Sequence, residues 1–232
     1  MGENIKCTRL LLVEGVDDIK FFQELCHRLF REEYSATLQI IDYNGKDNLK
    51  NAFNDVLLPQ PAFDDVTHLG IVRDADFTGG ALRSVQNILK GVARKQLSIP
   101  EQHNQFVGTD PSVGIFIMPS GNRKGMLETL VLDAVQSDEI MPCVDDYFAC
   151  IEKKGIFPKE EPLDKARFAV YQASAQLRMR TYIEGKNVHE EALAKDRKRS
   201  SLDDIYKMTW WSWDVPIFDE VKAFLRELFT AP

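Results

Sequence analysis

The sequence predicts an α/β protein with a mostly parallel sheet, followed by a helical C-terminal part. Four short apolar runs, typical of buried strands, alternate with stretches whose apolar residues recur every three or four positions. After about Gly125 only the helical spacing remains. Strands that alternate with helices of this length are usually joined by right-handed crossovers, which makes neighbouring strands parallel.

The first strand and helix carry the strongest signals. Residues 8–14 form an apolar run that fits a strand buried on both faces, and Gly15 ends it. In 17–30 the apolar residues have helical spacing, with Asp17 or Asp18 suited to the cap or first turn. The next elements are expected to be a strand at 37–43, a helix at 46–58, a strand at 68–73, a helix at about 81–95 and a strand at 113–118.

The chain is expected to divide into a four-stranded catalytic domain, 1–135, and a helical C-terminal subdomain, 136–232. The pattern changes near Gly121, and apolar residues then recur at helical spacing in 125–137, 141–153, 163–180 and 215–229. A polar connector at about 184–204 contains the basic run 195–199. Such a run can contact nucleic acid, but charge runs are more often solvated loops.

Composition narrows the classes of function. The 232 residues are 44% hydrophobic, yet no apolar stretch is long enough for a membrane span and no signal region precedes the first strand, so we expect a cytoplasmic protein with no membrane partner. Four cysteines without zinc-ligand spacing suggest reduced, mostly buried thiols. A net charge of −7 argues against nucleic-acid binding by charge alone, so contact with phosphates must be local or mediated by metal.

Four carboxylates fall where two predicted strands end. Glu14 closes the first strand, and a helix that begins near Asp17 would aim Asp18 at the same edge. Asp74 and Asp76 follow the third strand, two residues apart in extended chain and so on one face. These side chains converge if the first and third strands are neighbours. Hard oxygen ligands of this kind suit Mg²⁺ or Mn²⁺.

A purely structural interpretation stands beside this one. Glu14 could pair with a nearby arginine such as Arg73, while the aspartates cap helices. Three separate carboxylates at strand ends favour the metal site, because capping needs one for each helix. The glycines nearby, Gly15, Gly79 and Gly80, would let the backbone approach a ligand closely.

These residues resemble the two signature motifs of TOPRIM domains. The first is Val13-Glu14-Gly15 followed by Asp17-Asp18, and the second is Asp74-Ala75-Asp76 after a hydrophobic strand. The resemblance covers about 1–135. It implies the metal-dependent phosphodiester chemistry that topoisomerases, DnaG-type primases and OLD-family nucleases share.

The wider sequence is most similar to small stand-alone TOPRIM proteins allied to the OLD nucleases. Pro119-Ser120, followed by the run from Gly125 to Glu128, resembles their next motif. By this resemblance Glu128 would be a further metal ligand beside Glu14, Asp18, Asp74 and Asp76. Gly15 and Ser120 would contact the substrate phosphate, and Lys165 would stabilise charge in the transition state.

The expected function is therefore that of a divalent-metal-dependent nuclease acting on DNA or RNA, for which the effector of a defence or toxin system is one biological role. One alternative is a haloacid-dehalogenase-like phosphatase, because Asp74 to Thr78 also fits its D-x-D-x-T motif with Asp74 as the covalent nucleophile. Another is a non-catalytic interaction module that partners a separate ATPase. The cluster Trp210, Trp211 and Trp213 could stack bases, but it is more typical of a docking core or a homo-oligomer interface.

Overall fold

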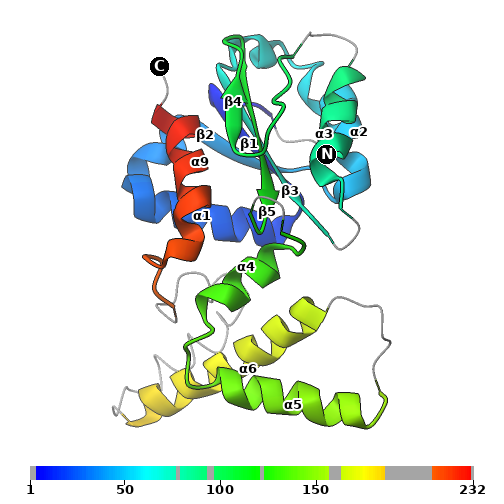
Figure 1. The fold of residues 1–232 in the computed structure, drawn as a ribbon. Coiled ribbons are helices and arrows are strands. Elements are labelled where there is room, and N and C mark those ends of the chain that lie inside the picture. The colour runs from blue at the N-terminus through cyan, green and yellow to red at the C-terminus, as the bar shows by residue number, and fades with distance from the viewer. Residues whose placement is uncertain are drawn as a thin grey trace. The chain divides into compact units, whose positions relative to one another are not determined.

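A five-stranded sheet forms the centre of the first of two compact units in the computed structural model. The structure describes residues 4–76, 79–92, 97–120, 123–156, 163–185 and 211–230. The first unit comprises Met1–Leu127 and Phe218–Pro232, and the second comprises Glu128–Ile217. Figure 1 shows the elements of each unit in order along the chain. The predicted mixed α/β class is confirmed, with a mostly parallel sheet flanked by helices.

Four of the five strands are parallel. The order across the sheet is β2-β1-β3-β5-β4. The parallel strands lie where the apolar runs predicted them: β1 (Arg9–Val13), β2 (Leu38–Asp42), β3 (His68–Asp74) and β5 (Ser112–Met118). Because β1 and β3 are hydrogen-bonded neighbours, their carboxyl ends meet at one edge of the sheet.

The fifth strand corrects the prediction of four. Strand β4 (Gln105–Val107) pairs antiparallel with β5 at the edge of the sheet. Three residues are too few to show the alternation of a strand, so no strand was predictable from the sequence here. Phe106 faces Gly114 across the pair, and a Cβ placed on Gly114 would come within 2.5 Å of the Phe106 ring. The missing side chain at Gly114 therefore leaves room for this ring.

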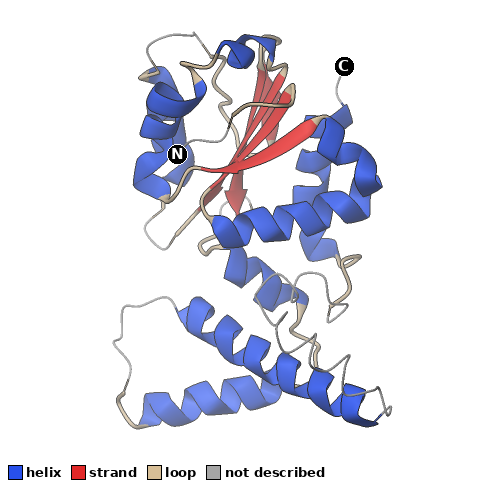
Figure 2. Ribbon diagram, turned by 180° about the vertical axis from the view of Figure 1, so that it is seen from behind, coloured by secondary structure: helices blue, strands red, loops and turns tan. Residues whose placement is uncertain are grey.

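Helices cover both faces of the sheet (Figures 1 and 2). On one face lie α1 (Val16–Phe30) and α9 (Asp219–Thr230), which contact each other. On the other lie α2 (Leu49–Asn51) and α3 (Ala81–Lys90), whose buried Leu49, Val85 and Leu89 join one cluster with alternate strand residues. Helix α3 is shorter than the expected 81–95: Gly91 is its C-cap and donates its backbone N–H to carbonyls of the last turn.

The C-terminal helix α9 corrects the predicted division at residue 135. We grouped its residues with the helical subdomain, but α9 packs on β3 and β5 of the first unit. Buried Phe224 lies 4.9 Å from Phe106 and 5.4 Å from Phe116, between ring centroids. Gly70 of β3 has no side chain, so the side chains of Phe224 and Leu228 can approach the strand backbone closely. The apolar face of α9 thus has its partner more than a hundred residues earlier in the chain.

Segment 46–58, predicted to be one α-helix, consists of a 3₁₀ helix, an α-helix and a π-helix in succession. A 3₁₀ turn, η2 (Lys46–Asn48), leads into α2, and a π-helix, η3 (Ala52–Leu57), completes the segment. Further 3₁₀ helices are η1 (Arg31–Ala36), η4 (Pro61–Asp65) and η5 (Pro216–Phe218). Buried Phe53 and Leu57 keep the apolar side of the segment against the core.

The second unit consists of helices in its described part, as predicted. They are α4, which begins at the boundary (Leu127–Ala134), α5 (Met141–Lys153) and α6 (Leu163–Gly185). Arg167 of α6 forms an ion pair with Asp145 of α5, and Tyr171 donates a hydrogen bond to Asp138 at 3.1 Å. Trp211 and Trp213 are buried, with ring centroids 5.5 Å apart, which agrees with a packed core. Trp210 and the basic run 195–199 lie outside the described residues.

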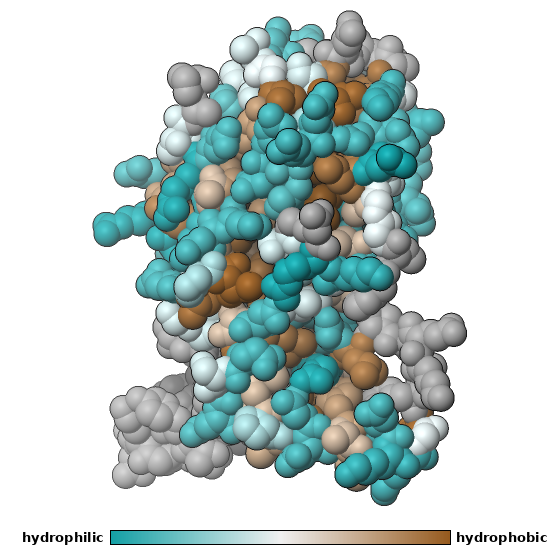
Figure 3. All heavy atoms as spheres, in the orientation of Figure 1, coloured by the Kyte–Doolittle hydropathy of each residue, from teal (hydrophilic) through white to brown (hydrophobic). Residues whose placement is uncertain are grey.

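The described surface shows two further outcomes. No helix in the described ranges is long and apolar enough to cross a membrane. The face seen in Figure 3 is largely hydrophilic, with apolar residues visible between polar side chains. The expectation of mostly buried thiols is wrong: Cys26 is buried, but Cys143 and Cys150 are exposed and Cys7 is partly exposed. Both exposed cysteines lie on α5.

His103 connects the loop before β4 to α9. Its Nδ1 accepts the backbone N–H of Ile117 at 2.9 Å, and its Nε2 lies 3.5 Å from Glu220 of α9. Burial lowers the pKa of His103, against the raising effect of Glu220. Because the folded pKa lies below the unfolded one, the stability contribution is complete above about pH 6.5 and is lost as the pH falls.

We therefore expect the wild type to lose melting temperature more steeply than His103→Asn between pH 7 and pH 5. Asparagine can keep an acceptor for the Ile117 N–H, and it does not titrate. Melting curves at fixed ionic strength measure the difference. The pKa of His68 is also lowered, and this residue contributes the same slope to both proteins. Parallel pH profiles would contradict the assignment to His103.

Candidate active site

Two carboxylates meet at the carboxyl edge of the sheet. Glu14 follows β1 directly, and Asp74 is the last residue of β3. The backbone N–H of Asp74 points to Glu14 Oε2 at 3.5 Å. The predicted adjacency of the first and third strands is thus present, and it brings Glu14 and Asp74 together.

Asp18 belongs to the same edge through the start of α1. Its Oδ2 accepts the backbone N–H of Gly15, the N-cap of α1, at 2.9 Å, so Asp18 binds back to the start of its own helix. The residue is buried. Asp18 therefore caps the helix, as the purely structural interpretation expects. It does so close to Glu14 and Asp74 at the strand ends.

Tyr43 is a buried residue of this edge that sequence reasoning missed. Its hydroxyl donates a hydrogen bond to the Val72 carbonyl at 2.8 Å. Burial raises the pKa of Tyr43 strongly, and the negative charges of Glu14, Asp18 and Asp74 raise it further, while Arg73 opposes them. Three of the predicted carboxylates thus act on one buried hydroxyl. The only sequence signal was the position of Tyr43 at the end of a predicted strand.

Asp76 is held in an unusual backbone conformation. Its φ of 52° lies in the left-handed region, which aspartate tolerates better than most residues. Asp76 and Gly125 exchange two backbone hydrogen bonds, of 2.9 and 3.1 Å. This bridge fixes the chain after β3. Backbone strain of this kind is concentrated at functional sites.

Two cations reach the carboxylates. Arg73 Nε lies 3.6 Å from Glu14 Oε2, and Lys46 Nζ lies 3.2 Å from Asp76 Oδ2. Arg73 also donates to the Lys46 carbonyl at 3.2 Å, so it joins β3 to the loop after β2. The Arg73 side chain is 8% exposed, whereas that of Lys46 is 50% exposed. The Glu14–Arg73 pair was part of the structural interpretation, and it coexists with the carboxylate group.

The present side-chain arrangement is not itself a metal cage. Within the described ranges, no three acidic, histidine or cysteine side chains are placed to hold one ion. Glu14 and Asp76 instead face Arg73 and Lys46. The donor chemistry suits a hard divalent cation, but binding would require these carboxylates to turn from their cations.

Glu14 is electrostatically strained. Burial raises its pKa, and the charge of Asp76 raises it further; Arg73, the Asp74 N–H and Lys46 act in the opposite direction. Because the folded pKa exceeds the ordinary value of about 4.5, the contribution of Glu14 to stability is complete below that pH and is lost as the pH rises. At neutral pH the charged Glu14 carboxylate therefore destabilises the folded state.

Glu14→Gln is therefore expected to melt above the wild type at pH 7 in EDTA, with the gap closing towards pH 4. Glutamine keeps an acceptor near Arg73 but carries no charge. Thermal denaturation across this range measures the gap. Glu227→Gln, an exposed change on α9, is the matched control and should show no such convergence. A variant that melts below wild type at pH 7 would mean that the Arg73 pair outweighs the burial cost.

The remaining predicted residues are distributed over both units. Gly15 is the N-cap of α1, with its N–H already donated to Asp18. Ser120 follows β5, next to β3, and is partly exposed at the same edge of the sheet. Glu128, partly buried on α4, and Lys165, exposed on α6, belong to the second unit. The group at the sheet edge is thus defined by residues of the first unit alone. Thr78 lies outside the described residues.

Comparison with known proteins places the chain in a family. Residues 8–230 match the family described as "Protein of unknown function (DUF3226)". The chain belongs to the DUF3226 family. The match spans the sheet unit, the helical unit and α9, so the DUF3226 sequence pattern covers both units described above.

Other comparisons add little to the DUF3226 assignment. No curated protein matches this sequence. Among solved structures, the crystal structure of the hypothetical protein PH0156 from Pyrococcus horikoshii OT3 is similar at a TM-score of 0.47 and 14% identity. The alignment covers 86% of this DUF3226 chain and 97% of that one.

Proposed function

We propose that this protein is a divalent-metal-dependent nuclease that hydrolyses nucleic-acid phosphodiesters. One observation carries the proposal: Glu14, Asp18, Asp74 and Asp76 gather at the carboxyl edge of the adjacent parallel strands β1 and β3. In open parallel sheets, ligands bind outside this edge. The raised pKa of Glu14 adds support, since perturbed carboxylates are concentrated at functional sites.

The side chains of the first unit suggest how the site would work. Glu14, Asp74 and Asp76 would hold Mg²⁺ or Mn²⁺, with Asp18 beside them. A bound ion of this kind polarises a phosphate and lowers the pKa of a coordinated water. Lys46, half exposed and 3.2 Å from Asp76, can leave that carboxylate and turn to a substrate phosphate. Glu14 would turn from buried Arg73, whose Nε lies 3.6 Å from Glu14 Oε2, to take up the ion.

A TOPRIM-like identity of the first unit is part of the same proposal. The two motifs that resemble TOPRIM signatures end neighbouring strands, as a shared site requires. The further roles of Glu128 and of Lys165 as a transition-state cation remain predictions from the resemblance. So do a separate ATPase partner and an oligomer formed through the Trp-rich segment.

The full chain is expected to cut nucleic acid only when Mg²⁺ or Mn²⁺ is present. The assay offers single- and double-stranded DNA and RNA with each metal, and then with excess EDTA. A generic phosphomonoester is included, because its turnover would favour the phosphatase that uses Asp74 as a nucleophile. Undiminished cleavage in EDTA, with metal absence confirmed by elemental analysis, would dispose of the metal mechanism.

A further inference from the structure

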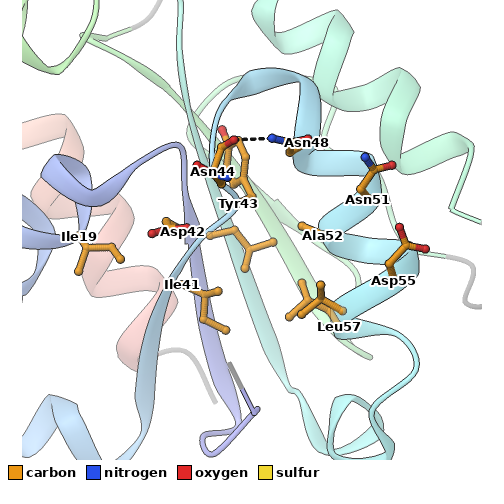
Figure 4. Close-up of a pocket in the computed structure, with 12 residues that line it drawn as sticks. Ile19, Ile41, Asp42, Tyr43, Asn44, Asn48, Asn51, Ala52, Asp55 and Leu57 are labelled. Atoms are coloured by element: carbon orange, nitrogen blue, oxygen red, sulfur yellow. Dashed lines mark hydrogen bonds between the residues drawn. The ribbon is translucent and has the colours of Figure 1, made fainter. Parts of the chain in front are cut away.

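A pocket of about 600 Å³ opens at the carboxyl end of β2, next to the candidate active site. It lies between the end of β2 and the helical segment 46–58, and Ile19 of α1 borders it (Figure 4). Its volume falls in the range of about 300–1,000 Å³ that small-molecule sites occupy. None of its lining residues is one of the four clustered carboxylates.

The lining combines aliphatic side chains with a set of amides and carboxylates. Ile19, Ala52 and Val56 are partly exposed and supply apolar surface, with buried Leu12, Ile41 and Leu57 behind them. Three asparagines and two aspartates supply the polar groups: Asp42, Asn44, Asn48, Asn51 and Asp55. In Figure 4, Asn48, Asn51 and Asp55 follow one another along the helical segment. None of the described residues that line the pocket carries a positive charge.

The walls of the pocket are irregular in a way that points to function. Asp55 lies in the π-helix η3, and π-helical turns are rare and are frequently found at functional sites. Asn44 has a φ of 58°, in the left-handed region. The Asn48 amide nitrogen donates to the Asn44 carbonyl at 2.5 Å, which fixes the amide and leaves its oxygen as an acceptor.

One short loop, 43–48, belongs to both the pocket and the active site. Tyr43, Asn44 and Asn48 line the pocket. Between them, the Gly45 N–H donates to the Glu14 carbonyl at 2.8 Å, and Lys46 reaches Asp76. A ligand in the pocket can therefore extend along this loop towards the carboxylate group.

The chemistry of the lining selects the ligand. Carboxylates without a cation repel a phosphate, but they accept hydrogen bonds from exocyclic amino groups, which cytosine, adenine and guanine carry and uracil and thymine lack. Asparagine amides donate and accept along a base edge, and aliphatic walls suit the base faces. We propose that this pocket binds the base of a nucleotide whose phosphate lies at the carboxylate site, with cytosine, adenine and guanine favoured over uracil and thymine. This inference rests on the proposed nuclease function and adds its base preference.

Nucleosides without phosphate test the pocket separately from the metal site. We would titrate cytidine, adenosine, guanosine and uridine into the full-length protein in EDTA, and follow amide NMR shifts. Cytidine or adenosine should shift residues of the pocket, and uridine should bind at least about threefold more weakly. Asn51→Ala and Asp55→Ala change exposed side chains and should each weaken binding about tenfold. Asn54→Ala and Asp47→Ala, on the same segment but outside the lining, should leave binding unchanged.

The outcomes separate this inference from the proposed function. Absence of binding by every nucleoside, equal binding by all four, or equal loss in lining and control variants would overturn the base pocket. Metal-dependent cleavage would survive any of these results. Selective nucleoside binding in a protein that never cleaves nucleic acid would retain the pocket and remove the nuclease.

Discussion

Asp74→Asn is expected to abolish cleavage, with a fall of at least about a hundredfold, and to remove most of the stabilisation by Mn²⁺. Ligand at about 100 times its dissociation constant stabilises the folded state by about 2.7 kcal/mol. For a chain of this size that corresponds to a rise of about 5–10 °C in melting temperature. The variant should gain only a small part of this rise, because it lacks one carboxylate of the site.

In EDTA the same variant should melt at or above the wild type. Asp74 ends β3 beside Glu14, so removing its charge relieves repulsion in the metal-free protein. Melting curves across a Mn²⁺ titration at fixed ionic strength measure both effects. Asp17→Asn is the matched control, because Asp17 is exposed on the first turn of α1. If wild type and Asp74→Asn gain equally from Mn²⁺, Asp74 is not a ligand and the central assignment fails.

Phe224→Ala is expected to destabilise the sheet unit by about 3–5 kcal/mol, the usual cost of emptying a buried aromatic site. Phe224 is fully buried, against Phe106 and Phe116 and over Gly70. A drop of roughly 10 °C in the melting temperature should follow. If the amides of β3 and β5 become less protected from hydrogen exchange, the lost stability is assigned to the sheet.

The control for this change is Glu227→Ala, an exposed position on the same helix. It should shift the melting temperature by less than about 2 °C, since exposed substitutions away from special contacts are usually close to neutral. A Phe224→Ala protein as stable as this control would show that α9 contributes little to the core of the first unit.

The sequence by itself determined the parallel part of the sheet and the carboxylates at its edge. The runs that became β1, β3 and β5 are buried on both faces, so their apolar character did not depend on knowing their neighbours. Glu14 and Asp74 were identifiable because a charged residue that ends such a run lies at the sheet edge. The condition left open, whether β1 and β3 are neighbours, is met.

Only the tertiary structure decided which groups act on these carboxylates. Arg73, Lys46 and Tyr43 reach the site from β3 and from the loop after β2. The packing of α9 on Gly70 and the antiparallel pairing of β4 with β5 are likewise visible only in the tertiary structure. These are contacts between segments far apart in the chain, and a local hydrophobic period reports which side of an element is apolar but not which element covers it.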